Sequence, residues 1–191
     1  MIRISKLYIP PISVISLCAL FILEPGIYFF IILFSVLFHE LCHILVMRFL
    51  KIRISSLTLL PLGIDIKSRG ETAGYKKQIA VSLAGALGNL FLFFIFKSSH
   101  SFFAYTNLLY ALFNLLPIKG LDGGEVLLGF FCLFLEADKS ENILKAVSFV
   151  FCVILWVIGV YILFILNGNI SIFALSVFLF ASIFIKTENC L

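Results

Sequence analysis

Hydrophobic and polar positions separate along this chain on the scale of whole segments, with long apolar runs divided by short stretches that hold most of the charges. A run of about 20 apolar residues has the length needed to cross a hydrocarbon core of about 30 Å as a helix. The pattern predicts an all-α integral membrane protein with six transmembrane helices. Their expected bounds are Tyr8–Leu23, Ile27–Leu50, Gln78–Phe96, Phe102–Ile118, Ile143–Leu166 and Ile170–Ile185.

The first run could also be a cleavable signal peptide, because Arg3 and Lys6 give it a basic start. No small-residue cleavage site follows it, and the stretch "EPG" leads directly into the second run. We therefore expect the first run to be retained as a membrane helix.

Composition and charge placement agree with six spans. The chain has 62% hydrophobic and 13% charged residues and a mean hydropathy of +1.18, whereas soluble domains hold about 25% charged residues. With the N-terminus inside, every Lys and Arg except Lys97 falls on the cytoplasmic side, as the positive-inside rule requires. The pattern predicts cytoplasmic termini. The net charge of +4 then follows from topology, and no basic patch indicates a nucleic-acid partner.

Two long cytoplasmic loops, Lys51–Lys77 and Lys119–Glu141, interrupt what we expect to be a single polytopic membrane domain over residues 1–191. In the first, "SSLTLLPLGIDIK" alternates partly with period two around Pro61 and Gly63, which predicts a short β-hairpin or re-entrant pair after the second span. An amphipathic surface loop fits the same residues equally well.

Five cysteines are scattered at no metal-ligand spacing, and an odd count argues against a disulfide framework. We interpret them as reduced packing residues. For Cys42 a role in the chemistry of the site is the alternative, because this residue lies between two histidines.

The stretch "FHELCHILV" places His39, Glu40 and His43 inside an apolar run, where ionisable groups are costly. Residues four apart share one helix face, so the two imidazoles can bind one zinc ion with Glu40 beside it. Zinc lowers the pKa of a water, and the carboxylate can take its proton and pass it to a leaving amine. The pattern is H-E-x-x-H. Residues that bridge helices, or line a cation or proton path, are the alternatives.

Two neutral imidazoles bring no negative charge, so a third, anionic ligand is expected. Asp122, in "NLLPIKGLDGGEVLL", is favoured over Asp65 and Glu125. Pro117 ends the fourth span, and Gly123 and Gly124 are expected to free the backbone to turn the aspartate back into the bundle. An ordinary helix-ending loop with an Asp N-cap is the alternative for this segment.

Three motifs in order resemble the site-2 proteases, which are intramembrane zinc metalloproteases. They are "FHELCH", the small-residue stretch "LAGALGN", and "NLLPIKGLDGG" with its N-x-x-P and L-D-G parts. The resemblance covers about Ile27–Leu128, and it implies a catalytic core there.

Carried over by motif, the resemblance implies that His39, His43 and Asp122 bind Zn²⁺ and that Glu40 is the general base. Asn114 would bind the substrate carbonyl or the oxyanion, and Asn89 is a second substrate-binding candidate. Close helix packing is nevertheless the expected purpose of the segment around Asn89, which could simply bridge two helices, because the segment holds four small residues: Ala84, Gly85, Ala86 and Gly88. The implied partner is a membrane-tethered protein substrate in the lipid bilayer, with room for regulatory membrane partners.

The span arrangement looks most like the bacterial sporulation branch, which processes a sigma-factor precursor in the cell membrane. That branch usually carries a C-terminal nucleotide-sensing domain, which we do not expect here. Cys42, Ala86 and Glu125 depart from residues common in the family, but none replaces a ligand or the base.

Two other functions remain open. A metal or proton transporter could use the same polar residues, but it predicts further polar positions through the outer halves of the spans, which are mostly Phe, Ile and Leu. An inactive relative that only binds membrane partners would not need the complete ligand set.

Overall fold

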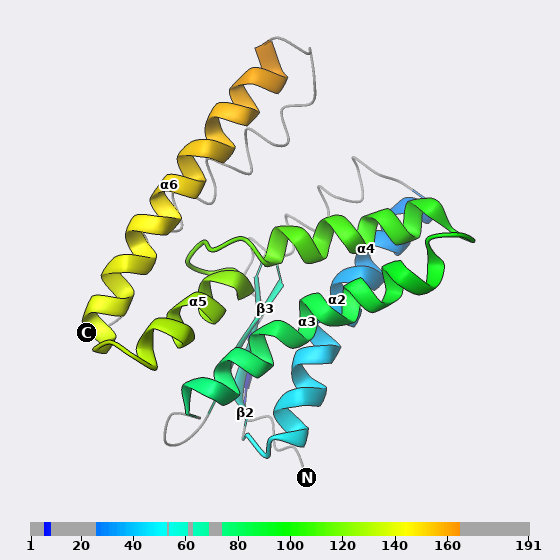
Figure 1. Cartoon of the computed structure of the whole chain (residues 1–191). Helices are drawn as coiled ribbons and strands as arrows, with labels where there is room; N and C mark the ends of the chain where they lie inside the picture. Colours follow the sequence, from blue (N-terminus) through cyan, green and yellow to red (C-terminus); the bar gives the residue numbers. More distant parts are fainter. Residues whose placement is uncertain (1–5, 9–25, 53, 61–62, 69–73, 165–191) are drawn as a thin grey trace. The chain divides into compact units, whose positions relative to one another are not determined.

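The computed structural model describes residues 6–8, 26–52, 54–60, 63–68 and 74–164. Backbone contacts divide the chain into two compact units, Met1–Phe113 and Asn114–Leu191, which are taken in turn. The elements in chain order are β1 (Lys6–Tyr8), α2 (Ile27–Phe49), β2 (Ile54–Leu60), β3 (Gly63–Ser68), α3 (Tyr75–Phe96), α4 (Ser101–Asn114), α5 (Asp122–Cys132) and α6 (Ala137–Phe164) (Figure 1).

In the first unit, α2 and α3 lie side by side (Figure 1). Small residues on α3 permit this approach, as they do in membrane helix pairs generally. Ala86 is fully buried, and a side chain on Gly88 would meet Cys42 Sγ and the Phe38 ring. The expectation that the small-residue stretch serves close helix packing is therefore confirmed.

Three described helices are long and apolar enough to cross a membrane: α2, α3 and α6. They correspond to the predicted second, third and fifth spans. The first span, apart from Tyr8, and the sixth lie outside the described residues.

The fourth predicted span, Phe102–Ile118, is shorter in the structure. Helix α4 has 14 residues and ends at Asn114, which gives it a length of only about 21 Å. The residue before a proline is disfavoured in helical conformation, and Pro117 lies three residues beyond this end. The prediction that the helix continues to Ile118 was wrong for this reason.

The loop Lys51–Lys77 contains two strands of a three-stranded sheet with the order β1-β2-β3. Strand β1 is parallel to β2, and β2 is antiparallel to β3 with Leu60 opposite Gly63 at the closing end. The sheet therefore joins the residues before α2 to those between α2 and α3.

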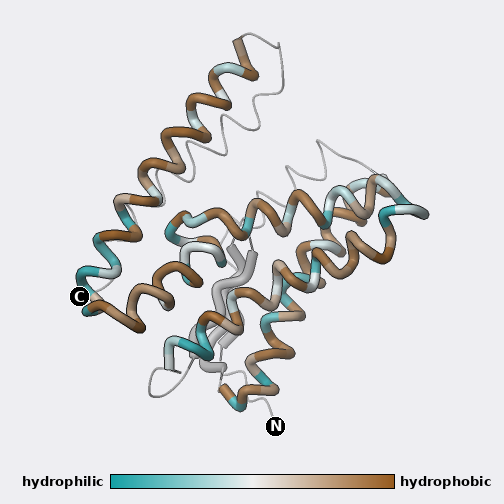
Figure 2. The backbone as a smooth tube through the Cα atoms, in the orientation of Figure 1, coloured by the Kyte–Doolittle hydropathy of each residue, from teal (hydrophilic) through white to brown (hydrophobic). Residues whose placement is uncertain are grey.

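In the second unit, α5 packs against α6. The prediction that Lys119–Glu141 is a loop was wrong, because α5 and the first turn of α6 occupy most of it. The apolar stretch after Asp122 is too short to suggest a span, yet it buries one face of an 11-residue helix. Figure 2 shows α6 hydrophilic at its Ala137 end and hydrophobic along most of the remainder.

Candidate metal centre

The two histidines of the H-E-x-x-H motif lie one turn apart on α2. Both are buried, His39 at 1% and His43 at 6% relative exposure. Their ring centroids are 4.7 Å apart with the planes at 80°. Glu40, also buried, follows His39 on the same helix. The expectation that a helix brings the two imidazoles together is confirmed.

Gly85 on α3 faces both rings. A Cβ atom built on Gly85 would lie 2.5 Å from His39 Nε2 and 2.5 Å from His43 Nε2. The two nitrogens therefore approach one point, and the missing side chain of Gly85 leaves room at that point. Any larger residue would push the imidazoles away from it. This notch, formed by His39, His43 and Gly85, is the core of the site.

The backbone of α3 also fixes the hydrogen on one ring. His43 Nδ1 lies 2.7 Å from the carbonyl oxygen of Val81. A carbonyl can only accept, so Nδ1 donates, and in the neutral imidazole Nε2 then carries the lone pair. A histidine that binds a metal through one nitrogen typically donates a hydrogen bond from the other. His43 is therefore held in the tautomer that a ligand needs, with Nε2 directed to the notch.

Tyr110 on α4 packs against the same site. Its ring centroid lies 5.0 Å from that of His39, with the planes at 81°. This edge contact restricts the orientation of His39 from the third helix of the unit. Sequence reasoning missed Tyr110, because an aromatic residue in an apolar run carries no signal of its own.

The two asparagines proposed to bind substrate, Asn89 and Asn114, belong to different helices, α3 and α4. Asn89 is fully buried on α3, one turn beyond Gly85, and its Nδ2 donates to the Ser35 carbonyl of α2 at 3.3 Å. It therefore bridges the two helices. Asn114 is the last residue of α4 and is buried.

Asp122 belongs to the second unit, where it is the first residue of α5 and is half-buried. The expected role of the following glycines was wrong. Gly123 and Gly124 are helical, and a Cβ on either would collide with a backbone carbonyl, of Leu115 or Ile118 respectively. Their purpose is close packing of the first turn against the preceding segment. The turn itself depends on Gly120, whose φ is +98°.

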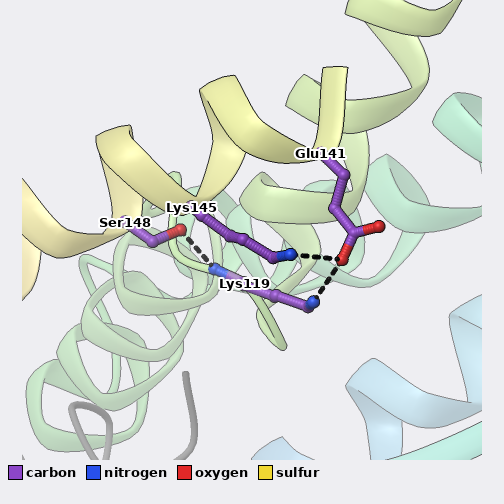
Figure 3. Close-up of polar contacts among 4 residues, drawn as sticks. All are labelled: Lys119, Glu141, Lys145 and Ser148. Atoms are coloured by element: carbon purple, nitrogen blue, oxygen red, sulfur yellow. Dashed lines mark hydrogen bonds and ion pairs between the residues drawn. The ribbon is translucent and has the colours of Figure 1, made fainter. Parts of the chain in front are cut away.

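Helix α6 holds the turn that precedes Asp122 (Figure 3). The Lys119 backbone N–H donates to Ser148 Oγ at 2.8 Å, and Ser148 Oγ donates to the Pro117 carbonyl at 3.4 Å. Glu141 Oε1 accepts from the ammonium groups of Lys119 at 2.7 Å and Lys145 at 3.3 Å. Ser148 is fully buried. The start of α5 is thus attached to α6 at two adjacent points.

Cys42 faces Gly88 on α3, away from the notch at Gly85. Its contact is one of helix packing. Three cysteines lie in the part of the chain that the structure describes, Cys42, Cys132 and Cys152, and all three are free thiols.

Comparisons with known proteins relate the chain to other sequences and structures. Residues 96–158 match the family Peptidase family M50. Over 165 residues the chain is 33% identical to Stage IV sporulation protein FB of Bacillus subtilis (strain 168), which takes in 80% of this chain and 56% of that protein. The chain thus spans little more than half the length of this relative. The fold is similar to that of a site-2 protease from Methanocaldococcus jannaschii, with a TM-score of 0.69 and 20% identity over 96% of this chain and 92% of that one.

Apolar helices of membrane-spanning length with an H-E-x-x-H motif facing a glycine notch are features expected of the class of membrane-embedded metallopeptidases. The resemblance seen in the three motifs is confirmed. The chain is similar to the site-2 proteases in fold and to the sporulation branch in sequence, and residues 96–158 match peptidase family M50.

Proposed function

We propose that this chain is an intramembrane zinc metalloprotease that hydrolyses a peptide bond in or near a transmembrane segment of a membrane-tethered protein. The observation that carries the proposal is the approach of two imidazole Nε2 atoms to one notch at Gly85. Its similarity to a sporulation protein supports a sigma-factor precursor, or another tethered regulator, as the substrate. Regulatory membrane partners fit the same setting.

The chemistry of the donor atoms fits zinc. Two imidazole nitrogens and one carboxylate form a common set of protein ligands for catalytic zinc. His39 and His43 supply the nitrogens, and the Val81 carbonyl keeps His43 in the required tautomer. Asp122 supplies the carboxylate in this proposal. Its negative charge, with that of Glu40, offsets the dipositive ion and so lowers the cost of burial.

Bound zinc would act as a Lewis acid and lower the pKa of a water molecule. Glu40, next to His39 on the helix, takes the proton from the attacking water and passes it to the leaving amine. Asn114 donates from its amide to the substrate carbonyl, where negative charge develops during attack. Asn89 acts from the neighbouring turn of α3 as a second substrate-binding residue.

The β-sheet of the first unit supplies a way to present the substrate. A helical peptide bond is shielded by its own hydrogen bonds and must be unwound before attack. Strand β3 lies at one end of the order β1-β2-β3, so an extended segment can add to it as a further strand. An amphipathic surface role for this loop remains the alternative.

We further propose that residues 1–191 act as one membrane domain with its catalytic core at about Ile27–Leu128. The distribution of Lys and Arg supports six spans with both termini in the cytoplasm, and the similarity to a Bacillus subtilis protein supports a bacterial cell membrane. In this orientation the site opens near the cytoplasmic face, and cleavage releases a cytosolic fragment.

Co-expression with a membrane-tethered sigma-factor precursor tests the proposal. The wild-type chain should release a cytosolic fragment, and Glu40→Gln should release none while it keeps the same zinc content by mass spectrometry. His39→Ala should lose both zinc and cleavage. Cleavage by Glu40→Gln would refute the role of Glu40, and fully active protein purified without zinc would refute the proposal as a whole.

A metal or proton transporter that uses His39, Glu40, His43 and Asp122 is the alternative function. The match of residues 96–158 to peptidase family M50 does not favour it. Zinc or proton flux into liposomes that contain the purified chain, lost in Glu40→Gln, would favour transport instead.

A further inference from the structure

A layer of polar side chains crosses the first unit about one turn from His39 and two turns from His43, toward the Ile27 end of α2. It consists of Ser35 on α2, Asn89 on α3 and Asn107 on α4, and all three are fully buried. Ser35 precedes His39 by four residues, and Asn89 follows Gly85 by four. The three residues are neutral, so this layer does not continue the ionisable chemistry of the site.

Ring contacts place Asn107 at this level. The Phe34 and Phe103 rings lie 5.9 Å apart, and the His39 and Tyr110 rings lie 5.0 Å apart. Helices α2 and α4 are therefore aligned in the same direction. Asn107, between Phe103 and Tyr110 on α4, falls between the levels of Phe34 and His39 on α2.

Asn89 and Asn107 each use the side-chain amide as a donor, while the side-chain carbonyl oxygen, Oδ1, accepts no hydrogen bond from the described residues. Asn107 Nδ2 donates to the Phe103 carbonyl of its own helix at 2.9 Å, and Asn89 Nδ2 donates to the Ser35 carbonyl. The Oδ1 atoms of Asn89 and Asn107 are buried and have no hydrogen-bond partner in the part of the chain that the structure describes. A buried acceptor without a partner destabilises a protein. Two such acceptors beside the helix that carries the histidines therefore suggest that they have a function.

The proposed reaction supplies such a reason. To be cut, a transmembrane helix must unwind, and each unwound residue exposes a backbone N–H in a region without bulk water. An enzyme that stabilises this state must offer buried acceptors close to the cut site. Four helical residues rise about 6 Å, which an extended peptide covers in about two residues. Ser35 in the polar layer is at that distance along α2 from His39.

We propose that Asn107 is a substrate-binding residue whose Oδ1 accepts a hydrogen bond from a backbone N–H of the unwound substrate, about two residues from the scissile bond. Asn89 Oδ1 is the second acceptor of the same layer. This inference rests on the proposed proteolytic function, and it assigns to that function a residue outside the three family motifs.

The substitution Asn107→Leu, of similar size, separates binding from structure. It removes the buried acceptor, so thermal stability in detergent should stay equal or rise. Cleavage of a membrane-tethered sigma-factor precursor should fall about 5- to 100-fold in kcat/KM, because a substrate N–H loses its partner. Thr106→Val is the matched control. Thr106 is half-buried and makes the same kind of bond to its own helix, to the Phe102 carbonyl at 2.8 Å, but that bond is exposed.

A substrate series identifies the N–H. In synthetic transmembrane peptides of the same precursor, single ester linkages replace the amides within three residues of the cut site, and each removes one N–H. In the wild type, one of these positions should reduce cleavage. In Asn107→Leu the same ester should have no further effect, whereas esters elsewhere should act equally in both proteins.

The outcomes are distinct. If Asn107→Leu cleaves as the wild type does, or if ester and substitution effects add at every position, Asn107 does not bind substrate, and its Oδ1 is held by water or unsatisfied. If stability and cleavage fall together, its role is structural. If the wild type cleaves no precursor and Glu40→Gln behaves identically, the proposed function falls first and this inference with it.

Discussion

Glycines permit close packing in both units, but the atoms that they face are side-chain atoms in the first unit and backbone atoms in the second. On α3, the space at Gly85 faces the tips of two imidazole rings. In the second unit, the space at Gly123 and Gly124 faces main-chain carbonyls of residues just before α5. Side-chain tips can rotate away from an intruding methyl group, whereas the backbone of a tight turn cannot. A methyl group at Gly85 should therefore impair the chemistry of the first unit, whereas one at Gly123 or Gly124 should destabilise the second unit.

The largest expected effect is on the second unit. Gly123→Ala places a methyl group against the Leu115 carbonyl, and the free energy of unfolding should fall by about 3 kcal/mol, at the upper end for overpacking. Thermal unfolding in detergent measures it. Gly120→Ala has open space but a φ of +98°, so it should cost less, about 1–2 kcal/mol. A smaller loss for Gly123→Ala than for Gly120→Ala would contradict the account of the turn.

The counterpart in the first unit is Gly85→Ala. The new methyl group should displace the His39 and His43 rings while the fold survives, and zinc affinity should fall about 100-fold, as for loss of ligand orientation elsewhere. Competition with a chelator measures it. Gly88→Ala is the control, because it meets the Cys42 thiol one turn away and leaves the notch intact. Equal zinc affinities in the two variants would show that the space at Gly85 is not needed for His39 and His43 to bind zinc.

A smaller effect is expected from the contact between α6 and the turn before Asp122. Ser148→Ala leaves the Lys119 N–H buried without its acceptor, so stability should fall by about 1–3 kcal/mol. Ser140→Ala is the matched control on the same helix. Ser140 is equally buried, but its hydroxyl binds the Glu136 carbonyl, which already accepts from the Ser140 N–H. Ser148→Thr, which keeps the hydroxyl, should restore most of the loss.

The smallest effect is expected from the ion pairs on the same turn. Lys145 and Glu141 are both more than one-third exposed, so Lys145→Ala should change stability by about 0.5 kcal/mol or less. Lys119 is 14% exposed, and Lys119→Met should therefore cost more than Lys145→Ala and depend less on salt. Unfolding at low and high ionic strength checks this order; the reverse order would mean that Lys119 does not hold the turn.

The sequence predicted the apolar helices and the paired histidines because both depend on local periodicity. A helix that contains H-E-x-x-H must present His39 and His43 on one face, whatever surrounds it. Contacts that depend on tertiary packing could not be predicted this way. Tyr110 against His39, the Val81 carbonyl at His43 and Ser148 at Lys119 join positions distant in sequence by residue types that are common in any membrane helix.

The wrong predictions for Gly123, Gly124 and helix α5 also concern features that depend on tertiary packing. A pair of glycines after an aspartate is compatible with a flexible turn or with a tightly packed helix start, and only the neighbouring carbonyls distinguish the two at Gly123 and Gly124. Helix α5 was missed because its apolar stretch is half the length of a membrane span, and length was the criterion that had worked for α2, α3 and α6. The third ligand and the substrate-binding role of Asn89 and Asn114 stay predictions from motif order.

The partner of His43 Nδ1 is an oxygen that every amino acid possesses. Exchange of Val81 for alanine leaves that oxygen in place, so alanine scanning along α3 would report only the packing of the Val81 side chain against Met47, although the tautomer of the imidazole depends on the backbone at this position. Replacement of the following peptide bond by an ester, which weakens the carbonyl as an acceptor, is the kind of chemical substitution that would expose such a hidden dependence.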